Sequence, residues 1–283
     1  MVKIGRKGPP WALCFLLLAL SGCNVDILGF FGSTDFNERF RERGSFNFLN
    51  SAELAPNFSA PYSFIVLSDT HIEGGDTHGL ERIKDTVQGA NAGGENIRFV
   101  VVTGDITQNG RRQDLEKFLE IAESLRSLSV PLYPVIGNHD IFSGNWSLWR
   151  ELIGSSTYCV ESPDTTLIML DSANANFGRD QLEWLEDRLR GAKGNTFVFT
   201  HANLFTESIK DIEMLTDTRE RARVLSLLKG RCDALFAGHV HRRIIREAGG
   251  VWYITQEDFK GHSNYCLVRV DAAGGISWEF KKL

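Results

Sequence analysis

Short apolar runs alternate with amphipathic stretches through most of the chain after residue 62. The runs span four or five residues and end in polar residues or glycine, which is typical of buried strands in a mixed α/β sheet. Between several of them, apolar residues recur at a spacing of three or four, which predicts amphipathic helices. The expected strands are Ser63–Leu67, Arg98–Val102, Leu132–Ile136, Thr166–Leu170, Thr196–Thr200 and Ala234–Ala237, and the expected helices are Gly79–Ala92, Gln113–Leu128, Asp180–Arg190 and Thr218–Leu228.

The C-terminal part of the chain has a different pattern. Its last 35 residues alternate apolar and polar positions around Gly-Gly pairs at 249–250 and 274–275, which predicts hairpins. Farther upstream, Asp180 opens a helical run and is its expected N-cap. We therefore expect one mixed α/β domain over residues 62–283, with ligands bound at the carboxyl ends of its strands.

Composition and charge narrow the classes of function. The 283 residues carry 31 Lys and Arg against 36 Asp and Glu, a formal net charge of -5. A surface built for nucleic acid needs dense positive charge, so this balance argues against a DNA or RNA partner. It does not exclude a substrate that carries phosphate, because bound metal ions would reverse the local field. Nothing in the composition predicts an oligomeric state.

The first residues resemble an export signal. Three basic residues precede the apolar run Trp11–Leu20, which is too short to span a bilayer as a helix and is typical of a secretory signal. Leu20-Ser21-Gly22-Cys23 then resembles a bacterial lipobox, which implies that residues 1–22 are removed and that Cys23 is lipidated. We expect an exported protein, held by its lipid on the outer side of a bacterial membrane, periplasmic or at the cell surface. An ordinary cleaved signal followed by an unrelated Cys is the alternative.

Residues 23–61 are interpreted as a lipidated N-terminus and tether. Seven of the 19 Phe lie in residues 24–61, too many for a freely solvated linker, so part of this segment is expected to pack on the domain. Cys159, Cys232 and Cys266 remain in the domain, and each has apolar neighbours in the sequence. We expect buried free thiols, although their number also permits one disulfide.

Residues that commonly bind metals follow five of the apolar runs directly. Five of the seven His stand in these segments, together with Asp and Asn. Imidazole nitrogens combined with carboxylate and amide oxygens suit divalent transition metals. Five structurally satisfied His in an inert domain would be the alternative interpretation. The segments are Asp69–His71, Thr103–Asp105, Gly137–Asp140, Thr200–His201 and Gly238–His241.

These segments resemble the motifs of the calcineurin-like metallophosphoesterase family, D-x-H, G-D, G-N-H-D/E, H and G-H-x-H, in the same order across residues 69–241. The resemblance implies an α/β sandwich of two mixed β-sheets flanked by helices. It also implies two divalent transition metal ions, whether Mn, Fe, Zn or Ni. The implied ligands are Asp69, His71 and His241 for the first ion, Asn138, His201 and His239 for the second, and Asp105 between the two.

The same resemblance implies a reaction and two further roles. A hydroxide shared between the ions would attack a phosphomonoester or phosphodiester. His139 would stabilise or protonate the leaving oxygen, and Asp140 would either orient His139 or cap the loop. His78 and Arg111 are weaker candidates for contacts with the substrate. A solvated loop His and a solvated helix start are the alternatives for these two.

Differences from the motifs of particular branches narrow the part of the family that this sequence resembles. Asp105 is not followed by the Asp-Arg-Gly of Ser/Thr protein phosphatases, and Gln108 stands where purple acid phosphatases place an iron-binding Tyr. About 40 residues follow His241, too few for the added domain of periplasmic 5′-nucleotidases. The chain most resembles the compact class III cyclic-nucleotide phosphodiesterases, although Asn203 stands where many of them have the Pro of His-x-Pro.

The expected substrate is therefore a small phosphoester or a phosphorylated compound of the cell envelope, with a diester favoured. A catalytically vestigial surface lipoprotein, acting as a binding or envelope-organising module, is the alternative function. The presence of every expected ligand argues against that alternative.

Overall fold

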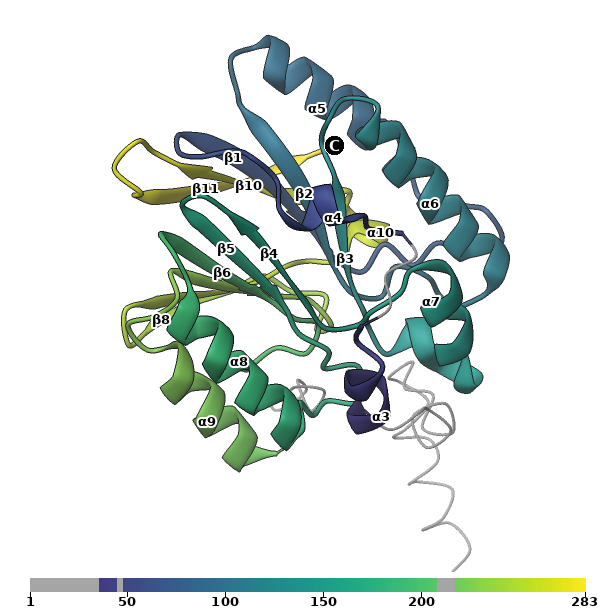
Figure 1. The fold of residues 1–283 in the computed structure, drawn as a ribbon. Coiled ribbons are helices and arrows are strands. Elements are labelled where there is room, and N and C mark those ends of the chain that lie inside the picture. Colours follow the sequence, from purple (N-terminus) through teal and green to yellow (C-terminus); the bar gives the residue numbers. More distant parts are fainter. Residues whose placement is uncertain (1–35, 45–47, 208–216) are drawn as a thin grey trace, which may run out of the picture.

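The computed structural model describes residues 36–44, 48–207 and 217–283, and these form two stacked β-sheets with helices on both outer faces (Figure 1). The first sheet has the strand order β11-β10-β1-β2-β3, and the second has the order β4-β5-β6-β7-β9-β8. The predicted sandwich of two mixed sheets is confirmed. The strands are β1 (Tyr62–Leu67), β2 (Ile97–Thr103), β3 (Leu132–Val135), β4 (Tyr158–Ser162), β5 (Thr165–Met169), β6 (Asn195–Phe199), β7 (Ala234–Ala237), β8 (Ile244–Ala248), β9 (Val251–Thr255), β10 (Asn264–Val270) and β11 (Ile276–Lys282).

Strand direction brings the important strand ends together. β1, β2 and β3 are parallel, as are β5, β6, β7 and β9. Antiparallel strands flank these parallel blocks, with β10 and β11 in one sheet and β4 and β8 at the edges of the other. Each parallel block therefore presents its carboxyl ends, and the loops that follow them, at one edge of its sheet.

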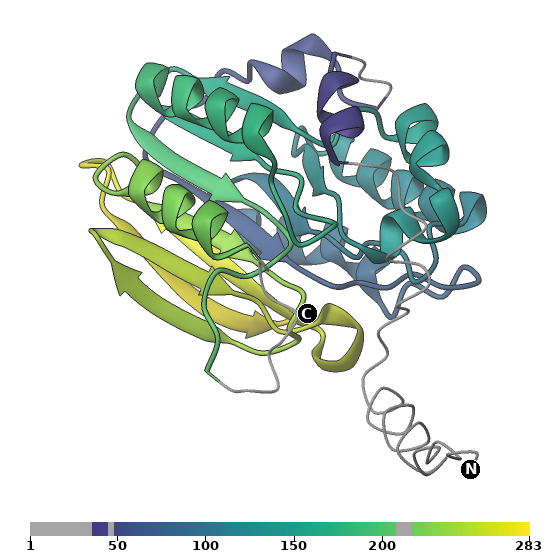
Figure 2. The ribbon, with the colours of Figure 1, turned by 90° about the horizontal axis from the view of Figure 1, so that it is seen from below.

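Helices cover the two outer faces of the sandwich. Figure 2 shows α8 and α9, in green, on one side and α6 and α7, in teal, on the other. Helices α5, α6 and α7 pack on the first sheet, and α8 and α9 pack on the second. The helices are α3 (Phe36–Arg41), α4 (Ser51–Leu54), η1 (Leu80–Arg82), α5 (Ile83–Ala92), α6 (Arg112–Arg126), η2 (His139–Gly144), α7 (Trp146–Leu152), α8 (Arg179–Gly191), α9 (Thr218–Leu228) and α10 (Phe259–His262).

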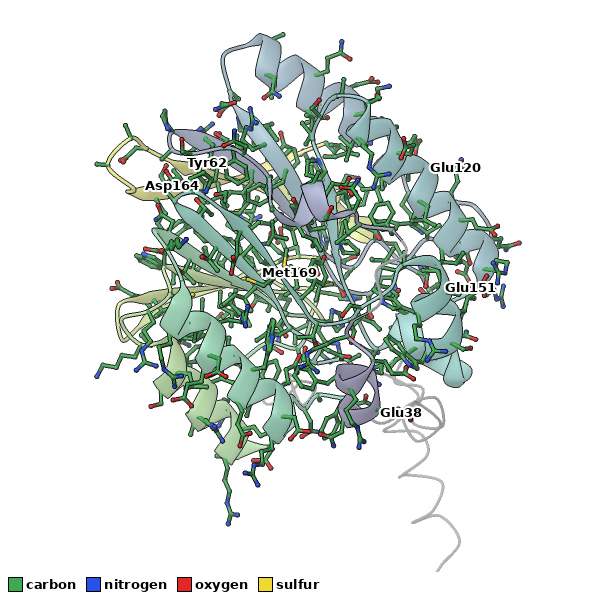
Figure 3. All side chains as sticks on the ribbon, in the orientation of Figure 1. Glu38, Tyr62, Glu120, Glu151, Asp164 and Met169 are labelled. Atoms are coloured by element: carbon green, nitrogen blue, oxygen red, sulfur yellow. The ribbon has the colours of Figure 1, made fainter. Side chains whose placement is uncertain are left out.

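The layer between the sheets is rich in aromatic side chains. Phe64 of β1 stacks on Phe99 of β2 with ring centroids 4.7 Å apart, and it meets Phe197 of β6 edge-on at 5.0 Å. Figure 3 shows Met169 of β5 in the middle of this layer and Tyr62 beside Asp164 at one end of it. These rings are completely buried, so they fix the separation of the two sheets.

Most predicted elements are present within one or two residues, but three differences stand out. Asp180 is not the N-cap of α8: Gly178, at φ 79°, precedes the helix, and Glu220 accepts hydrogen bonds from the N–H groups of Phe177 and Gly178. Both Gly-Gly pairs do turn hairpins, but a short helix, α10, separates β9 from β10. Strand β4 was not predicted, because its five residues contain no apolar run of four or five residues.

The described part of the expected tether packs on the domain, as its Phe content suggested. Phe40, Leu49 and Phe58 are buried, and Arg39 of α3 is completely buried against Asp171. Cys23 and the expected signal lie outside the described residues, so the domain boundaries remain predictions. In the part of the chain that the structure describes, no helix is long and apolar enough to cross a membrane.

The expected free thiols are confirmed, but Cys159 is only partly buried. Cys159, Cys232 and Cys266 are all free thiols, and the last two are buried. Burial raises the pKa of Cys266 to about 12, so the thiol stays protonated and unreactive at neutral pH.

Candidate metal centre

Five strands from both sheets carry the expected ligands to one end of the sandwich. In the first sheet, β1 leads into Asp69 and His71, β2 into Asp105, and β3 into Asn138. In the second, β6 leads into His201, and β7 leads into His239 and His241. The structure therefore brings together residues that lie as far apart as 69 and 241 in the sequence.

The ligand atoms form two groups that share Asp105. In one group, Nε2 of His241 lies 3.2 Å from Oδ1 of Asp69 and 3.3 Å from Nε2 of His71. Oδ2 of Asp105 lies 3.9 Å from Nε2 of His71. These are the residues expected around the first ion.

The second group is equally compact. Nε2 of His201 lies 3.0 Å from Oδ1 of Asn138, 3.1 Å from Nδ1 of His239 and 3.3 Å from Oδ1 of Asp105. Each group thus gathers nitrogen and oxygen donors around a common centre, with potential ligand atoms within 4.8 Å of one another. This donor set suits a divalent transition metal in both groups, so the residues present fit the two expected ions.

The pKa values of the His ligands show how the buried carboxylates affect the charge of the centre. Burial lowers the pKa of His71 to about 4 and that of His239 to about 3. Burial opposes the charge of His201 as well, but Asp105 outweighs it and raises the pKa of His201 to about 10. His241, hydrogen-bonded to Asp69, has its pKa raised to about 9 in the same way. The buried carboxylates of both groups therefore favour positive charge beside them, in the region where an ion would bind.

Unusual backbone conformations aim the ligands at the centre. Five of the seven expected ligands have positive φ values between 46° and 73°, a region that residues other than Gly rarely adopt. Such strain persists only where the surrounding structure imposes it, and it is concentrated at functional sites. The five are Asp69, His71, Asp105, His239 and His241.

Glycines let these loops approach one another closely. A Cβ atom on Gly238 would lie 1.8 Å from Oγ of Ser68 and 2.5 Å from Oδ2 of Asp69. A Cβ atom on Gly104 would lie 2.3 Å from Nδ1 of His201. Any larger residue at either position would therefore displace a ligand.

Two residues that support the ligands, Ser68 and Ser172, were not singled out from the sequence. Ser68 donates a hydrogen bond to Oδ2 of Asp69, and Oγ of Ser172 accepts from the main-chain N–H groups of His201 and Ala202. Nδ1 of His201 donates to the carbonyl oxygen of Thr103 at 2.9 Å, which leaves Nε2 for the centre. The signal for Ser68 is its position next to a motif, whereas Ser172 follows a strand without a motif.

His139 lies at the edge of the centre, as its expected role requires. Its Nδ1 donates to the carbonyl oxygen of Gln108 at 2.8 Å, because a carbonyl can only accept. Nε2 therefore faces inward, 3.9 Å from Oδ2 of Asp105. The imidazole side chain is 12% exposed, so it remains accessible from outside.

Of the two roles left open for Asp140, the hydrogen bonds favour the loop cap. Its carboxylate is buried and accepts from the N–H groups of Ile106, Thr107 and Gly137 and from the hydroxyl of Thr107. These bonds tie the loop after β2 to the loop after β3. Asp140 therefore positions His139 through the backbone rather than by orienting the imidazole ring.

The two weaker candidates lie in different surroundings. Nε2 of His78 lies 3.1 Å from the carbonyl oxygen of His71, so His78 contacts the main chain of an expected ligand. Arg111 is exposed at the start of α6, and no contact between Arg111 and the ligands is recorded in the described part of the chain. The structure thus favours the solvated helix start for Arg111.

Comparisons with known proteins agree with this geometry. Residues 62–243 match the family described as calcineurin-like phosphoesterase. The chain is 27% identical over 211 residues to a "Probable cyclic nucleotide phosphodiesterase" of Rhodopseudomonas palustris, covering 67% of this chain and 73% of the relative. It is 31% identical over 160 residues to a "Probable glycerophosphodiester phosphodiesterase" of Arcobacter nitrofigilis, covering 51% of this chain and 56% of the relative.

Among solved structures, a dimetal phosphatase from Danio rerio is similar with a TM-score of 0.57 at 18% identity, covering 75% of this chain and 94% of that protein. At this identity the likeness concerns the fold alone, and it confirms the predicted architecture. The family match extends over more than half of the chain and includes all five ligand-bearing segments. The chain therefore belongs to the calcineurin-like phosphoesterase family, whose members are dimetal hydrolases of phosphoesters.

Proposed function

We propose that this protein hydrolyses a phosphodiester, or less readily a phosphomonoester, outside the cytoplasmic membrane, to which its N-terminal lipid would anchor it. The observation that carries the catalytic part is the convergence of seven potential ligands, from both sheets, into two groups that share Asp105. The named relatives, both diesterases by name, support the preference for a diester.

The proposed roles follow from the two groups. Asp69, His71 and His241 would hold one ion, Asn138, His201 and His239 would hold the other, and Asp105 would contact both. Two such ions supply Lewis acidity toward the phosphoryl oxygens and lower the pKa of a coordinated water. The protein contributes the fixed positions of the ligands and a buried setting that strengthens every charge interaction.

His139 is the proposed general acid. With Nδ1–H donated to Gln108, its Nε2 carries the proton that the departing alkoxide needs. Oδ2 of Asp105 lies 3.9 Å from this nitrogen, so His139 borders the carboxylate that the two groups of ligands share. The neutral imidazole left behind remains held by Gln108, ready to be protonated again.

The N-terminal pattern supports the proposed location. A basic segment, ten apolar residues and a lipobox-like Cys23 follow one another in the order that bacterial lipoprotein signals have. Replacing Cys23 with Ser would test the anchor, since the variant should no longer incorporate labelled palmitate or remain with the membrane fraction.

Turnover by the purified chain beginning at residue 24 would test the catalytic part. The apoprotein would be supplied with Mn, Fe, Zn or Ni and given a nitrophenyl monoester or a bis-nitrophenyl diester. We expect turnover that depends on metal, favours the diester and is lost in Asn138→Ala. Two bound ions without turnover of either ester would instead support the binding-module alternative.

A further inference from the structure

Lys260 of α10 is held beside the metal centre without being one of its expected ligands. The N–H groups of Phe259 and Lys260 donate to the carbonyl oxygens of Ser68 and Asp69, at 2.8 and 3.2 Å. These bonds fix α10 to the segment that carries the first ligand. The Lys260 side chain is exposed, and its ammonium donates to Oε1 of Gln108 at 3.2 Å.

The contact with Gln108 places Lys260 next to the proposed acid. The main-chain carbonyl of Gln108 accepts from Nδ1 of His139, while its side-chain amide accepts from Lys260. One residue therefore connects the ammonium group to the imidazole. Lys260 thus lies along the same edge of the centre as His139.

The acids nearest in sequence to Lys260 are already engaged. Asp258 accepts from the N–H of Gly261 and pairs with His262 at 2.8 Å. Glu257 accepts from Arg243 and Asn264 at 2.6 Å each. The ammonium of Lys260 is therefore held by a neutral amide, an interaction that an anion can replace at small cost because charge-assisted hydrogen bonds are stronger.

The open side of the centre is the side on which α10 lies. The side chain of His241 is 46% exposed, whereas that of His201 is 1% exposed. Asp258, which caps α10, is close enough to favour the charge of His241. A phosphoester bound among the ligands would therefore extend its organic substituent toward this side, within reach of the flexible Lys260 side chain.

We propose that Lys260 binds an anionic group on the organic substituent of the phosphoester, by exchanging its contact with Gln108 for that group. Lys260 would then select esters that carry a second negative charge, such as a carboxylate, over esters with a neutral substituent. This inference rests on the proposed phosphoesterase function and adds the class of substrate.

Two matched diesters would test the proposal on the metal-loaded full chain. Para-nitrophenyl phenyl phosphate and its meta-carboxyphenyl counterpart release the same nitrophenolate, so they differ only in the remote charge. We expect the wild type to favour the carboxylated ester by about 10-fold in kcat/KM, mainly through KM, as an exposed charge-assisted contact would give. Lys260→Met should abolish this preference, and Lys260→Arg should retain it.

Lys281→Met is the matched control. It removes the same charge from an exposed lysine of β11 that pairs with Glu279, and it should leave the preference unchanged. A wild type without the preference, or a Lys260→Met variant that keeps it, would overturn the proposal.

A binding measurement separates this proposal from the proposed function. Calorimetry would compare phenylphosphonate with its meta-carboxyphenyl counterpart, neither of which needs to be hydrolysed. The expected result is about 10-fold tighter binding of the carboxylated compound by the wild type and equal binding by Lys260→Met. Should no ester be turned over, this comparison alone decides for or against the role of Lys260.

Discussion

Replacing Arg39 with Met is expected to destabilise the protein strongly, because the change leaves a buried carboxylate unpaired. Arg39 is fully buried in α3, and its guanidinium donates to both oxygens of Asp171, at 2.7 and 2.9 Å, and to Oδ1 of Asn174 at 2.6 Å. Removing one partner of a buried ion pair costs about 3–5 kcal/mol. For a chain of this size that corresponds to a fall in Tm of roughly 6–10 °C.

Differential scanning calorimetry of three variants would test this reasoning. Arg41→Met removes the same charge from an exposed position of the same helix and should change the free energy of unfolding by less than about 0.5 kcal/mol. The double variant Arg39→Met, Asp171→Leu should recover most of the loss, because an apolar pair can replace a buried ion pair at little cost.

The comparison of Arg39 with Arg41 decides the outcome. Equal and small effects of the two single variants would mean that α3 does not dock on the domain in solution. A large effect of Arg39→Met that the second substitution fails to relieve would mean that the cost does not arise from the unpaired Asp171. Either result would refute the argument above.

Three further predictions concern the centre and the core. His139→Ala should retain both ions, measured by elemental analysis, while kcat falls by about 10²–10⁴-fold; loss of an ion would instead make His139 a ligand. Gly238→Ala should lower the metal content of the purified protein, because the new Cβ would lie 1.8 Å from Oγ of Ser68. By contrast, Gly89 lies in α5 with open space around it, so Gly89→Ala should raise the free energy of unfolding, measured by urea titration, by about 0.5–1 kcal/mol. Burial raises the pKa of Cys266 to about 12 from 9.0, so its contribution to stability is complete below pH 9 and is lost as the pH rises toward 12. The urea midpoint should therefore fall above pH 9 and fall less in Cys266→Ala; an equal decline in both proteins would contradict this.

The strands and the convergence of the candidate ligands could be predicted because the same segments of sequence carry both signals. Apolar runs such as Phe99–Val102 end directly in polar residues such as Asp105, so one pattern locates a strand and the ligand that follows it. Parallel direction then brings the strand ends to one edge, as the carboxyl ends of β1, β2 and β3 show. Local patterns were sufficient for this part of the structure.

The interactions that depend on distant residues could not be predicted in this way. Arg39 and Asp171 are 132 positions apart, and neither has a neighbour in the sequence that marks it as half of a buried pair. The contact of Lys260 with Gln108 spans 152 positions and depends on the short helix that the alternating pattern concealed. The positive φ of Asp69 or His241 is likewise imposed by the fold, since neither residue type requires that conformation.

Neither sheet alone would hold either ion. The first group takes Asp69 and His71 from the loop after β1 and His241 from the loop after β7. The second takes Asn138 from the loop after β3 and His201 from the loop after β6. Each group therefore spans the two sheets, and their separation sets the distances between its ligands. Because rigid aromatic packing fixes that separation, a smaller residue in the layer between the sheets should weaken metal binding as well as the fold. The packing between the sheets thus positions the candidate catalytic centre, and this explains how ligands that follow five separate strands reach a common point.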